Sequence, residues 1–342
     1  MTVNRESGNP ALVEIIRAEI RKRGPVSFSW FMQQALYHPE HGYYSSGRAA
    51  IGRKGDYFTN ISVGSLFGKL ITAQFAEIWE QLGRTNNFVI VEQGAHDGQF
   101  ARDVLSSAEE NWPEFFDAMR YKIVEPFPFW RERQQAELGT FSPRVEWLEV
   151  LEPFAGIHFS NELVDAMPID LSGKLVGLDG DNFVFVAADA SATKCNRVAL
   201  DWVNDVVGNL QRGYILIIDY GFAQEFREIV QTCADHRQLD SPFEQIGYAD
   251  ITAHIDWESI ANRAKQNGAR IAGFTDQHHF LTGIISTWPA FAESSDSKTK
   301  RALQTLLHPE MLGRTFQVMA LEKGIDAGPQ LAGFKFAKRH EP

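Results

Sequence analysis

The sequence lacks an excess of positive charge: 33 lysines and arginines stand against 44 aspartates and glutamates, for a formal net charge of −11. Proteins that bind nucleic acids draw their affinity from clustered Lys and Arg side chains that displace counterions. The densest basic run, RAEIRKR at residues 17–23, falls on a predicted amphipathic helix and is typical of a solvated face near a helix C-terminus. We therefore expect no nucleic-acid partner. An acidic surface suits a small cationic cofactor or a basic protein substrate.

Cysteines and long apolar runs are also scarce. The two cysteines, Cys195 and Cys233, do not have the spacing of metal ligands. So few cysteines favour a protein of a reducing compartment, with a disulfide between the two as the alternative. No apolar run reaches the roughly 20 residues that span a bilayer. The first residues, MTVNRESGNP, lack the basic-then-apolar order of a secretory signal. We expect a cytoplasmic protein without a membrane span, and the oligomeric state stays open, a homodimer included.

The histidines lack the spacing of metal ligands. HPEH at residues 38–41 contains a proline that prevents regular helical spacing, and His278 and His279 are adjacent, so they point in different directions from a helix. The sequence contains no H-E-x-x-H or Cys-x-x-Cys motif. We therefore predict no metal site.

The predicted elements fall into a helical region followed by an α/β region. Three helices are expected first, at residues 10–23, 27–37 and 64–82. The glycine- and tyrosine-rich loop between the last two is longer than the roughly dozen residues of a plain connection, so it is a candidate for a site. Five strand patterns then alternate with helical ones, at residues 88–94, 121–126, 144–150, 156–163 and 213–221. The alternation predicts an α/β fold with a doubly wound, mostly parallel sheet.

Further patterns complete the expected organisation. Residues 173–188 contain two strand-like runs around an Asp-Gly turn, which predicts an inserted β-hairpin. The last part should contain a helix at residues 256–267, a strand at 269–274, a helical stretch and a final strand at 315–323. We therefore expect an N-terminal helical region over 1–85 and one α/β domain over 86–342, with the insertion near 171–200.

The stretch FVIVEQGAHDGQFARDVL, residues 88–105, has the pattern of a strand, a tight turn and a helix. Gly94 and Gly98 would let the backbone approach a ligand, and a helix starting near Gln99 would present unpaired N–H groups. Ligands of open parallel sheets bind beyond the carboxyl ends of the strands, where this turn lies. Glu125, ending the next strand, could accept hydrogen bonds from both hydroxyls of a ribose. A plain turn without a ligand is the alternative.

The residues inside the turn bear on the choice of cofactor. A dinucleotide site uses three glycines, so that a pyrophosphate can lie on the helix N-terminus. Here His96 replaces the central glycine, and Asp97 would repel pyrophosphate. An adenosyl sulfonium carries positive charge and no phosphate. The turn therefore favours S-adenosylmethionine over NAD, and an NAD-linked oxidoreductase is the less favoured alternative.

Several motifs together resemble the MidA family of S-adenosylmethionine-dependent methyltransferases. They cover most of the chain in family order and include YHPEHGYY (37–44), GDYFT (55–59), EQGAHDG (92–98), NELVDAMP (161–168), DYG (219–221) and DITAHIDW (250–257). The resemblance implies a class I methyltransferase-like sheet of order 3-2-1-4-5-7-6 whose last strand is antiparallel. It also implies S-adenosylmethionine as the cofactor and an arginine of a protein as the methyl acceptor.

The chain departs from the family pattern at two motifs. The family usually has E-x-G-P-G-x-G where this chain has EQGAHDG, and it usually continues GDYFT with Ser-Pro-Glu where this chain has Asn-Ile-Ser. The cofactor contacts that the resemblance implies are Glu92, Gly94, Ala95, His96, Asp97, Gly98 and Glu125, with Asp56 and Thr59 of GDYFT at the cofactor mouth. Alternatively, GDYFT forms a turn whose aromatic side chains pack in the core.

The expected reaction suggests roles for NELVDAMP and DITAHIDW. Methyl transfer is an in-line displacement, so the main task of the protein is to position the acceptor. A carboxylate can bind and orient the planar guanidinium of arginine through two hydrogen bonds. Glu162 is the first candidate and Asp165 the second, with Asn161 beside them, although these side chains could instead cap a helix. His254 is a candidate general base or a structural histidine.

A function of another class also fits these motifs. An assembly chaperone would bind a client protein through the crevice without turnover. The sequence does not identify the protein substrate or the number of methyl groups added.

Overall fold

The computed structural model describes residues 8–47, 59–188, 196–221, 229–235, 237–288, 296–326, 329–337 and 342. The chain forms two compact units. Unit 1 comprises Met1–Thr59, Val164–Asp201 and Arg227–His254, and unit 2 comprises Asn60–Leu163, Trp202–Phe226 and Ile255–Pro342. Each unit is described by itself below.

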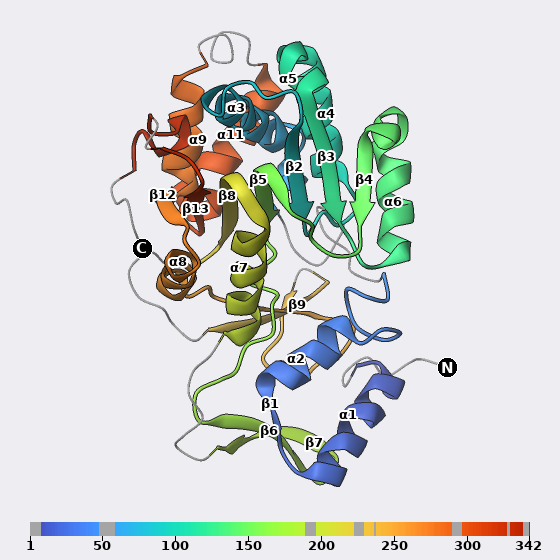
Figure 1. Ribbon diagram of the computed structural model, residues 1–342. Helices are drawn as coiled ribbons and strands as arrows, with labels where there is room; N and C mark the ends of the chain where they lie inside the picture. The colour runs from blue at the N-terminus through green and yellow to red at the C-terminus, as the bar shows by residue number, and fades with distance from the viewer. Residues whose placement is uncertain are drawn as a thin grey trace. The chain divides into compact units, whose positions relative to one another are not determined.

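Unit 2 is built on a seven-stranded sheet of order β12-β13-β8-β5-β2-β3-β4 (Figure 1). Its strands are β2 (Phe88–Gln93), β3 (Met119–Val124), β4 (Val145–Leu148), β5 (Phe154–Asn161), β8 (Leu210–Tyr220), β12 (Arg270–Asp276) and β13 (Phe316–Lys323). The first five run parallel, and β13 is antiparallel to both of its neighbours. When these seven strands are numbered 1 to 7 along the chain and the sheet is followed from β4 to β12, their order is 3-2-1-4-5-7-6. The last strand along the chain, β13, is antiparallel. The predicted class I methyltransferase-like fold is confirmed.

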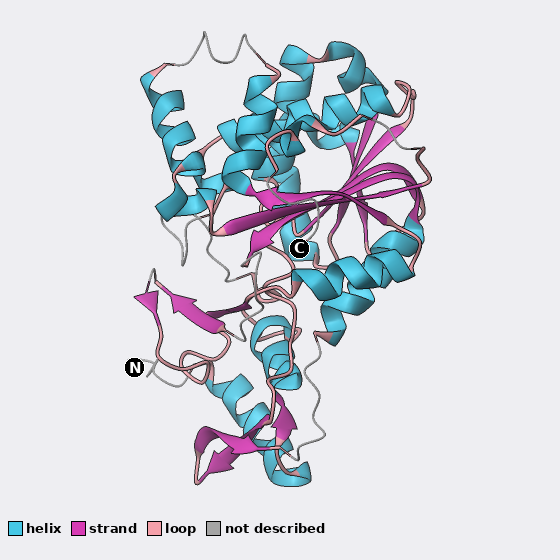
Figure 2. Cartoon of the chain, turned by 90° about the vertical axis from the view of Figure 1, so that its left-hand side faces the viewer, coloured by secondary structure: helices cyan, strands magenta, loops and turns pink. Residues whose placement is uncertain are grey.

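Helices cover both faces of this sheet (Figure 2). They are α3 (Leu66–Gln81), α4 (Gln99–Asn111), α5 (Pro113–Ala118), α6 (Pro128–Leu138), α7 (Arg197–Asn209), α8 (Trp257–Gln266), α9 (Gln277–Ser286) and α11 (Ser297–Leu307). On one face, Phe159 of β5 stacks on Phe100 of α4, with 4.4 Å between ring centroids. On the other face, the neighbouring His158 packs against Trp202 of α7 at 5.6 Å. The alternation of side chains along β5 therefore buries both faces, as a doubly wound sheet requires.

Unit 2 also contains shorter helical turns. They are η1 (Ile61–Val63), η2 (Gly139–Arg144), η3 (Pro309–Gly313) and η4 (Ala332–Phe334).

Among the described helices of the chain, none is long and apolar enough to cross a bilayer.

The described residues of unit 1 form two complete helices and two small sheets. The helices are α1 (Pro10–Arg23) and α2 (Phe28–Tyr37), and the strands are β1 (Val26–Ser27), β6 (Lys174–Asp179), β7 (Asn182–Ala187), β9 (Val230–Ala234), β10 (Arg237–Gln238) and β11 (Asp250–Ala253). β6 and β7 form the predicted hairpin around the Asp-Gly turn, and β1 adds to its edge. The sheet β10-β9-β11 was not predicted, because two- to five-residue strands are too short to show a clear period.

The basic run at residues 17–23 lies in the second half of α1. Arg17 pairs with Glu14 at 2.6 Å, and Arg21 pairs with Asp181 at 2.5 Å. The last turn of the helix carries three basic residues, where they complement the helix dipole. These contacts support the interpretation of this run as a solvated helix face.

The two units differ from the boundaries expected from the sequence. Residues 60–85 belong with the sheet rather than with the N-terminal region, because Phe75 of α3 packs edge-on against Phe159 at 5.6 Å. The inserted hairpin belongs with unit 1, where Val176 of β6 pairs with Val26 of β1. Contacts between residues distant in sequence therefore decide the division.

Candidate active site

The turn after β2 has the backbone shape that its glycines predicted. Gly94 and Gly98 adopt φ angles of +85° and +88°, which favour glycine. The Gly98 N–H donates to the carbonyl of Ala95 at 2.8 Å, and α4 then begins at Gln99 as expected. A Cβ atom on Gly94 would lie 3.2 Å from the side chain of Leu163. The turn is therefore closed tightly and packs directly against the segment that follows β5.

His96 and Asp97 shape the start of α4. His96 adopts φ +45°, and its ring lies 4.4 Å from the ring of Trp130 on α6. The Asp97 carboxylate accepts a hydrogen bond from the Gln99 N–H at 3.1 Å. Burial raises the pKa of Asp97, but hydrogen bonds with His96 and the Gln99 N–H and the positive charge of Arg102 outweigh this effect and lower the pKa. An anion already occupies the helix N-terminus, which supports the argument against a pyrophosphate there.

Glu125 lies beside the turn, because β3 pairs in register with β2 and its last residue, Val124, is opposite Gln93. The Glu125 carboxylate accepts hydrogen bonds from the Phe127 N–H at 3.0 Å and from Gln134 Nε2 at 3.1 Å. Burial raises the pKa of Glu125. Two fixed donors hold this carboxylate in place, as a ribose acceptor at this position requires.

Gln134 connects Glu125 to the turn and was not predicted. This fully buried side chain of α6 donates to the carbonyl of His96 at 2.8 Å and accepts from Trp147 Nε1 at 2.8 Å. Sequence reasoning missed it because one glutamine on a polar helix gives no signal until the fold places it beside the turn.

Glu92 is buried on the β2 strand. Its carboxylate accepts a hydrogen bond from the Tyr121 hydroxyl at 2.7 Å. Burial raises the pKa of Glu92 to about 8, although the bond from Tyr121 opposes this shift. The residue predicted for cofactor binding is therefore mostly protonated at neutral pH in the absence of a ligand.

The raised pKa of Glu92 predicts a pH-dependent stability. Its ordinary pKa is 4.5, so between 4.5 and about 8 the folded chain holds a proton that the unfolded chain releases. The contribution of Glu92 to the stability of the folded state is fully present below the pKa that Glu92 has in the unfolded chain. This contribution is lost as the pH rises through about 8. We expect Glu92→Gln to melt at a higher temperature than the wild type near pH ~9, with a smaller difference near pH ~5. Thermal melting across this range is the measurement, and equal melting temperatures at all pH values would contradict it.

Asn161 and Glu162 lie together where β5 ends. Glu162 adopts φ +55°, an uncommon conformation for a residue with a side chain. Its Oε1 atom accepts hydrogen bonds from Asn161 Nδ2 at 2.8 Å and from the Asn60 N–H at 3.3 Å. Outliers of this kind gather at functional sites, where the surrounding structure enforces them. The predicted pair is therefore brought together at the carboxyl edge of the sheet.

Asp219 supports this strand end from β8. Its fully buried carboxylate accepts hydrogen bonds from the Leu163 N–H at 3.1 Å and from the Tyr220 N–H at 2.7 Å. It therefore satisfies two backbone N–H groups. The contact with Leu163 helps to hold the chain directly after Glu162.

Asp165 and His254 belong to unit 1, whereas Asn161 and Glu162 belong to unit 2. Within unit 1 the Ala253 N–H donates to the carbonyl of Asp165 at 2.8 Å, so Asp165 lies beside the strand that leads to His254. Burial lowers the pKa of His254 and so favours the neutral imidazole. A neutral ring can accept a proton, so its role as a base stays a prediction.

The GDYFT motif is described only at its end. Asp56 lies outside the described residues, and Thr59 is a buried residue of unit 1. The predicted cofactor contacts of both residues stay predictions.

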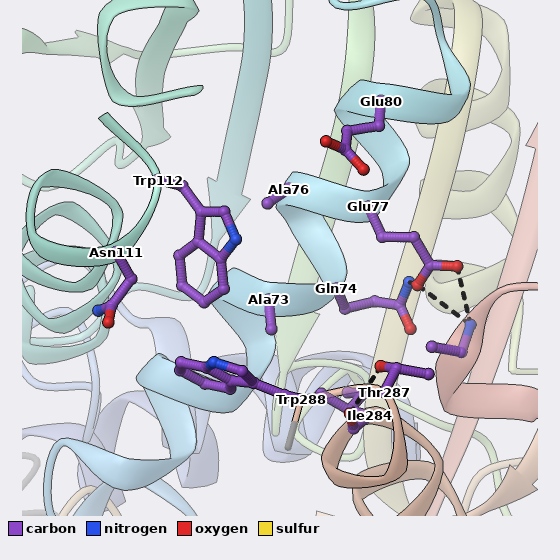
Figure 3. Close-up of a pocket in the computed structure, with 11 residues that line it drawn as sticks. Ala73, Gln74, Ala76, Glu77, Glu80, Asn111, Trp112, Ile284, Thr287 and Trp288 are labelled. Atoms are coloured by element: carbon purple, nitrogen blue, oxygen red, sulfur yellow. Dashed lines mark hydrogen bonds between the residues drawn. The ribbon is translucent and has the colours of Figure 1, made fainter. Parts of the chain in front are cut away.

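Unit 2 also contains a cavity of about 410 Å³ among α3, the end of α4, the end of α9 and η4. Figure 3 shows Trp112 and Trp288 beside it, with Gln74 and Glu77 on another side. Of the predicted site residues that the structure describes, none lines this cavity. Within the described ranges, no three metal-binding side chains gather in a cluster.

The arrangement at the strand ends fits S-adenosylmethionine. The glycine turn follows directly on β2, the fixed Glu125 carboxylate could accept hydrogen bonds from ribose hydroxyls, and Asp97 disfavours a phosphate. The comparisons with known structures agree. A protein of Burkholderia thailandensis described as a "likely methyl transferase" was solved with S-adenosyl-homocysteine bound. It is 28% identical to this chain and superposes with a TM-score of 0.83, over 96% of this chain and 95% of its own.

Sequence comparisons lead to the same family. The mitochondrial protein arginine methyltransferase NDUFAF7 of Rattus norvegicus is 31% identical over 89% of this chain and 82% of its own length. The Drosophila melanogaster homolog is 24% identical over 94% of this chain and 86% of its own length. The family model described as "Putative S-adenosyl-L-methionine-dependent methyltransferase" matches residues 70–175 and 185–275. Because this match covers more than half of the chain, the chain belongs to this family of S-adenosyl-L-methionine-dependent methyltransferases, as its resemblance to the MidA family predicted.

Proposed function

We propose that the protein methylates a guanidinium nitrogen of an arginine in a protein substrate. The names of its relatives from rat and fruit fly, both protein arginine methyltransferases, support this acceptor. The observation that carries the proposal is the Glu162 carboxylate, held by two N–H donors at the end of β5. A carboxylate fixed in this way can bind the fork of N–H groups on a guanidinium and orient one nitrogen.

The residues of the chain divide the work of methyl transfer. When bound, S-adenosylmethionine supplies an electrophilic methyl group on a sulfonium. Gly94 and Gly98 would receive the cofactor against the backbone, and Glu125 would accept its ribose hydroxyls. Glu162 would hold the guanidinium in line with the methyl group, and its negative charge would favour the proton loss that accompanies methylation. Asn161, Asp165 and His254 are further candidates, with His254 a neutral base.

Labelling of a cell lysate tests the proposal. The protein is incubated with a lysate of its own source and with S-adenosylmethionine carrying a labelled methyl group, and the labelled protein is hydrolysed. We expect the label in methylarginine of one or a few proteins. Label in another amino acid or in a small molecule would overturn the proposed acceptor. Omission of the protein is the control for other methyltransferases in the lysate.

Location and assembly stay proposals. The relatives named above are mitochondrial, whereas the sequence of this chain predicts a cytoplasmic protein. Cell fractionation tests that prediction, and sedimentation of the purified protein tests the homodimer.

A further inference from the structure

A chain of amide side chains leads from α9 to the proposed catalytic carboxylate. Gln277 Nε2 donates to Asn60 Oδ1 at 2.8 Å, and Asn60 Nδ2 donates to Asn161 Oδ1 at 3.1 Å. Asn161 Nδ2 then donates to Glu162 Oε1 at 2.8 Å. Asn60 and Gln277 are fully buried, and Asn161 is 7% exposed. All four residues belong to unit 2, although 217 positions separate Asn60 from Gln277 in the sequence.

One backbone carbonyl sets the direction of every hydrogen bond in this series of amides. Gln277 Nε2 also donates to the carbonyl of Leu306 at 3.2 Å, and a carbonyl oxygen can only accept. This contact places the amide nitrogen of Gln277, rather than its oxygen, toward Asn60. The oxygen of Asn60 must then face Gln277 and its nitrogen must face Asn161, which in turn presents its own nitrogen to Glu162. Each amide orientation follows from the one before it.

The opposite orientation would harm the site. With the amides reversed, Asn161 would present an oxygen to the Glu162 carboxylate, and two acceptors would face each other. Gln277 Oε1 has no hydrogen-bond partner among the described residues, which is costly for a buried oxygen. Gln277 therefore contributes through its amide nitrogen, which donates the first hydrogen bond of the series that ends at Glu162.

We propose that Gln277 and Asn60 are positioning residues that orient Glu162 for methyl transfer. This inference rests on the proposed function of Glu162. Asn60 acts twice, because its backbone N–H also donates to Glu162 Oε1 at 3.3 Å. These hydrogen bonds hold the carboxylate of Glu162, a residue with φ +55°, in one orientation before the substrate arrives. Such preorganisation matters because a misplacement of about 1 Å can slow a reaction roughly 100-fold.

The variant Gln277→Met tests the proposal, because methionine keeps the length of the side chain and removes both donated bonds. We expect the rate of methyl transfer at saturating cofactor to fall about tenfold, with the affinity for S-adenosyl-homocysteine unchanged. Asn60→Ala interrupts the next link and keeps the backbone bond to Glu162, so it should produce a similar loss. It carries the test if Gln277→Met does not fold.

Gln74→Met is the matched control. Gln74 of α3 is also fully buried, donates to Glu77 at 2.7 Å and accepts from the Gly333 N–H at 2.9 Å, beside the cavity of Figure 3. Its loss should lower the melting temperature about as much as Gln277→Met does, but should leave the rate of methyl transfer unchanged. Equal rates for the Gln277 and Gln74 variants would overturn the proposal, because both residues would then be structural.

A double variant separates this inference from the proposed function. If Gln277 acts through Glu162, then adding Gln277→Met to Glu162→Gln should cause no further loss of rate. A further tenfold loss would show that Gln277 acts by another route. If Glu162→Gln alone retains full activity, the proposed role of Glu162 fails. If Glu162→Gln is inactive and Gln277→Met is fully active, that role stands and the positioning chain fails.

Discussion

Glu162→Gln is expected to slow methyl transfer about 100-fold or more, with nearly normal thermal stability and cofactor affinity. Glutamine keeps the size of the side chain and an oxygen that can accept from Asn161 and Asn60. It loses the negative charge that would hold the guanidinium and favour its proton loss. Initial rates of arginine labelling, thermal melting and calorimetry with S-adenosyl-homocysteine are the measurements. Glu132→Gln, on the exposed surface of α6, is the control for removal of a carboxylate.

The same variant separates an enzyme from an assembly chaperone. If the protein methylates its client, Glu162→Gln should abolish labelling while the client is still bound, which a pull-down of the identified client would show. A variant that unfolds readily, while its folded fraction turns over normally, would make Glu162 a structural residue. The catalytic assignment would then move to Asp165 or His254.

Glu125→Ala is expected to weaken the binding of S-adenosylmethionine and S-adenosyl-homocysteine about 100-fold. The carboxylate is fixed by the Phe127 N–H and Gln134, so its remaining acceptor positions are available to two ribose hydroxyls without reorganisation. Calorimetry with both ligands measures the effect, and the melting temperature of the variant shows that the fold persists.

NAD in the same calorimeter provides the comparison with the alternative cofactor. We expect the wild type to bind both sulfur-containing ligands and not NAD, because the Asp97 carboxylate caps the start of α4. Tight binding of NAD with none of S-adenosylmethionine would contradict the assignment of the turn. Unchanged affinity in Glu125→Ala would place the ribose elsewhere.

The sequence by itself determined the longer helices and the strands of the main sheet, together with their order along the chain. Alternating strand and helix patterns predicted the parallel strands, and the Asp-Gly turn predicted the hairpin of β6 and β7, because both signals lie within a few consecutive residues. Gly94 and Gly98 likewise marked a turn that needs left-handed backbone conformations. The order of the strands came from the family resemblance, since periodicity does not specify which strands are neighbours.

Only the tertiary structure decided which polar side chains serve the site. Gln134, Asn60 and Gln277 have no local signal, although Asn60 stands where the chain departs from the family pattern after GDYFT. Their roles depend on hydrogen bonds between residues that are far apart in sequence, such as Gln277 and Asn60. The division that places Asp165 and His254 in unit 1 depends on long-range contacts as well. A hydrogen bond requires distance and direction in three dimensions, and these exist only after the sheet has brought its strand ends together.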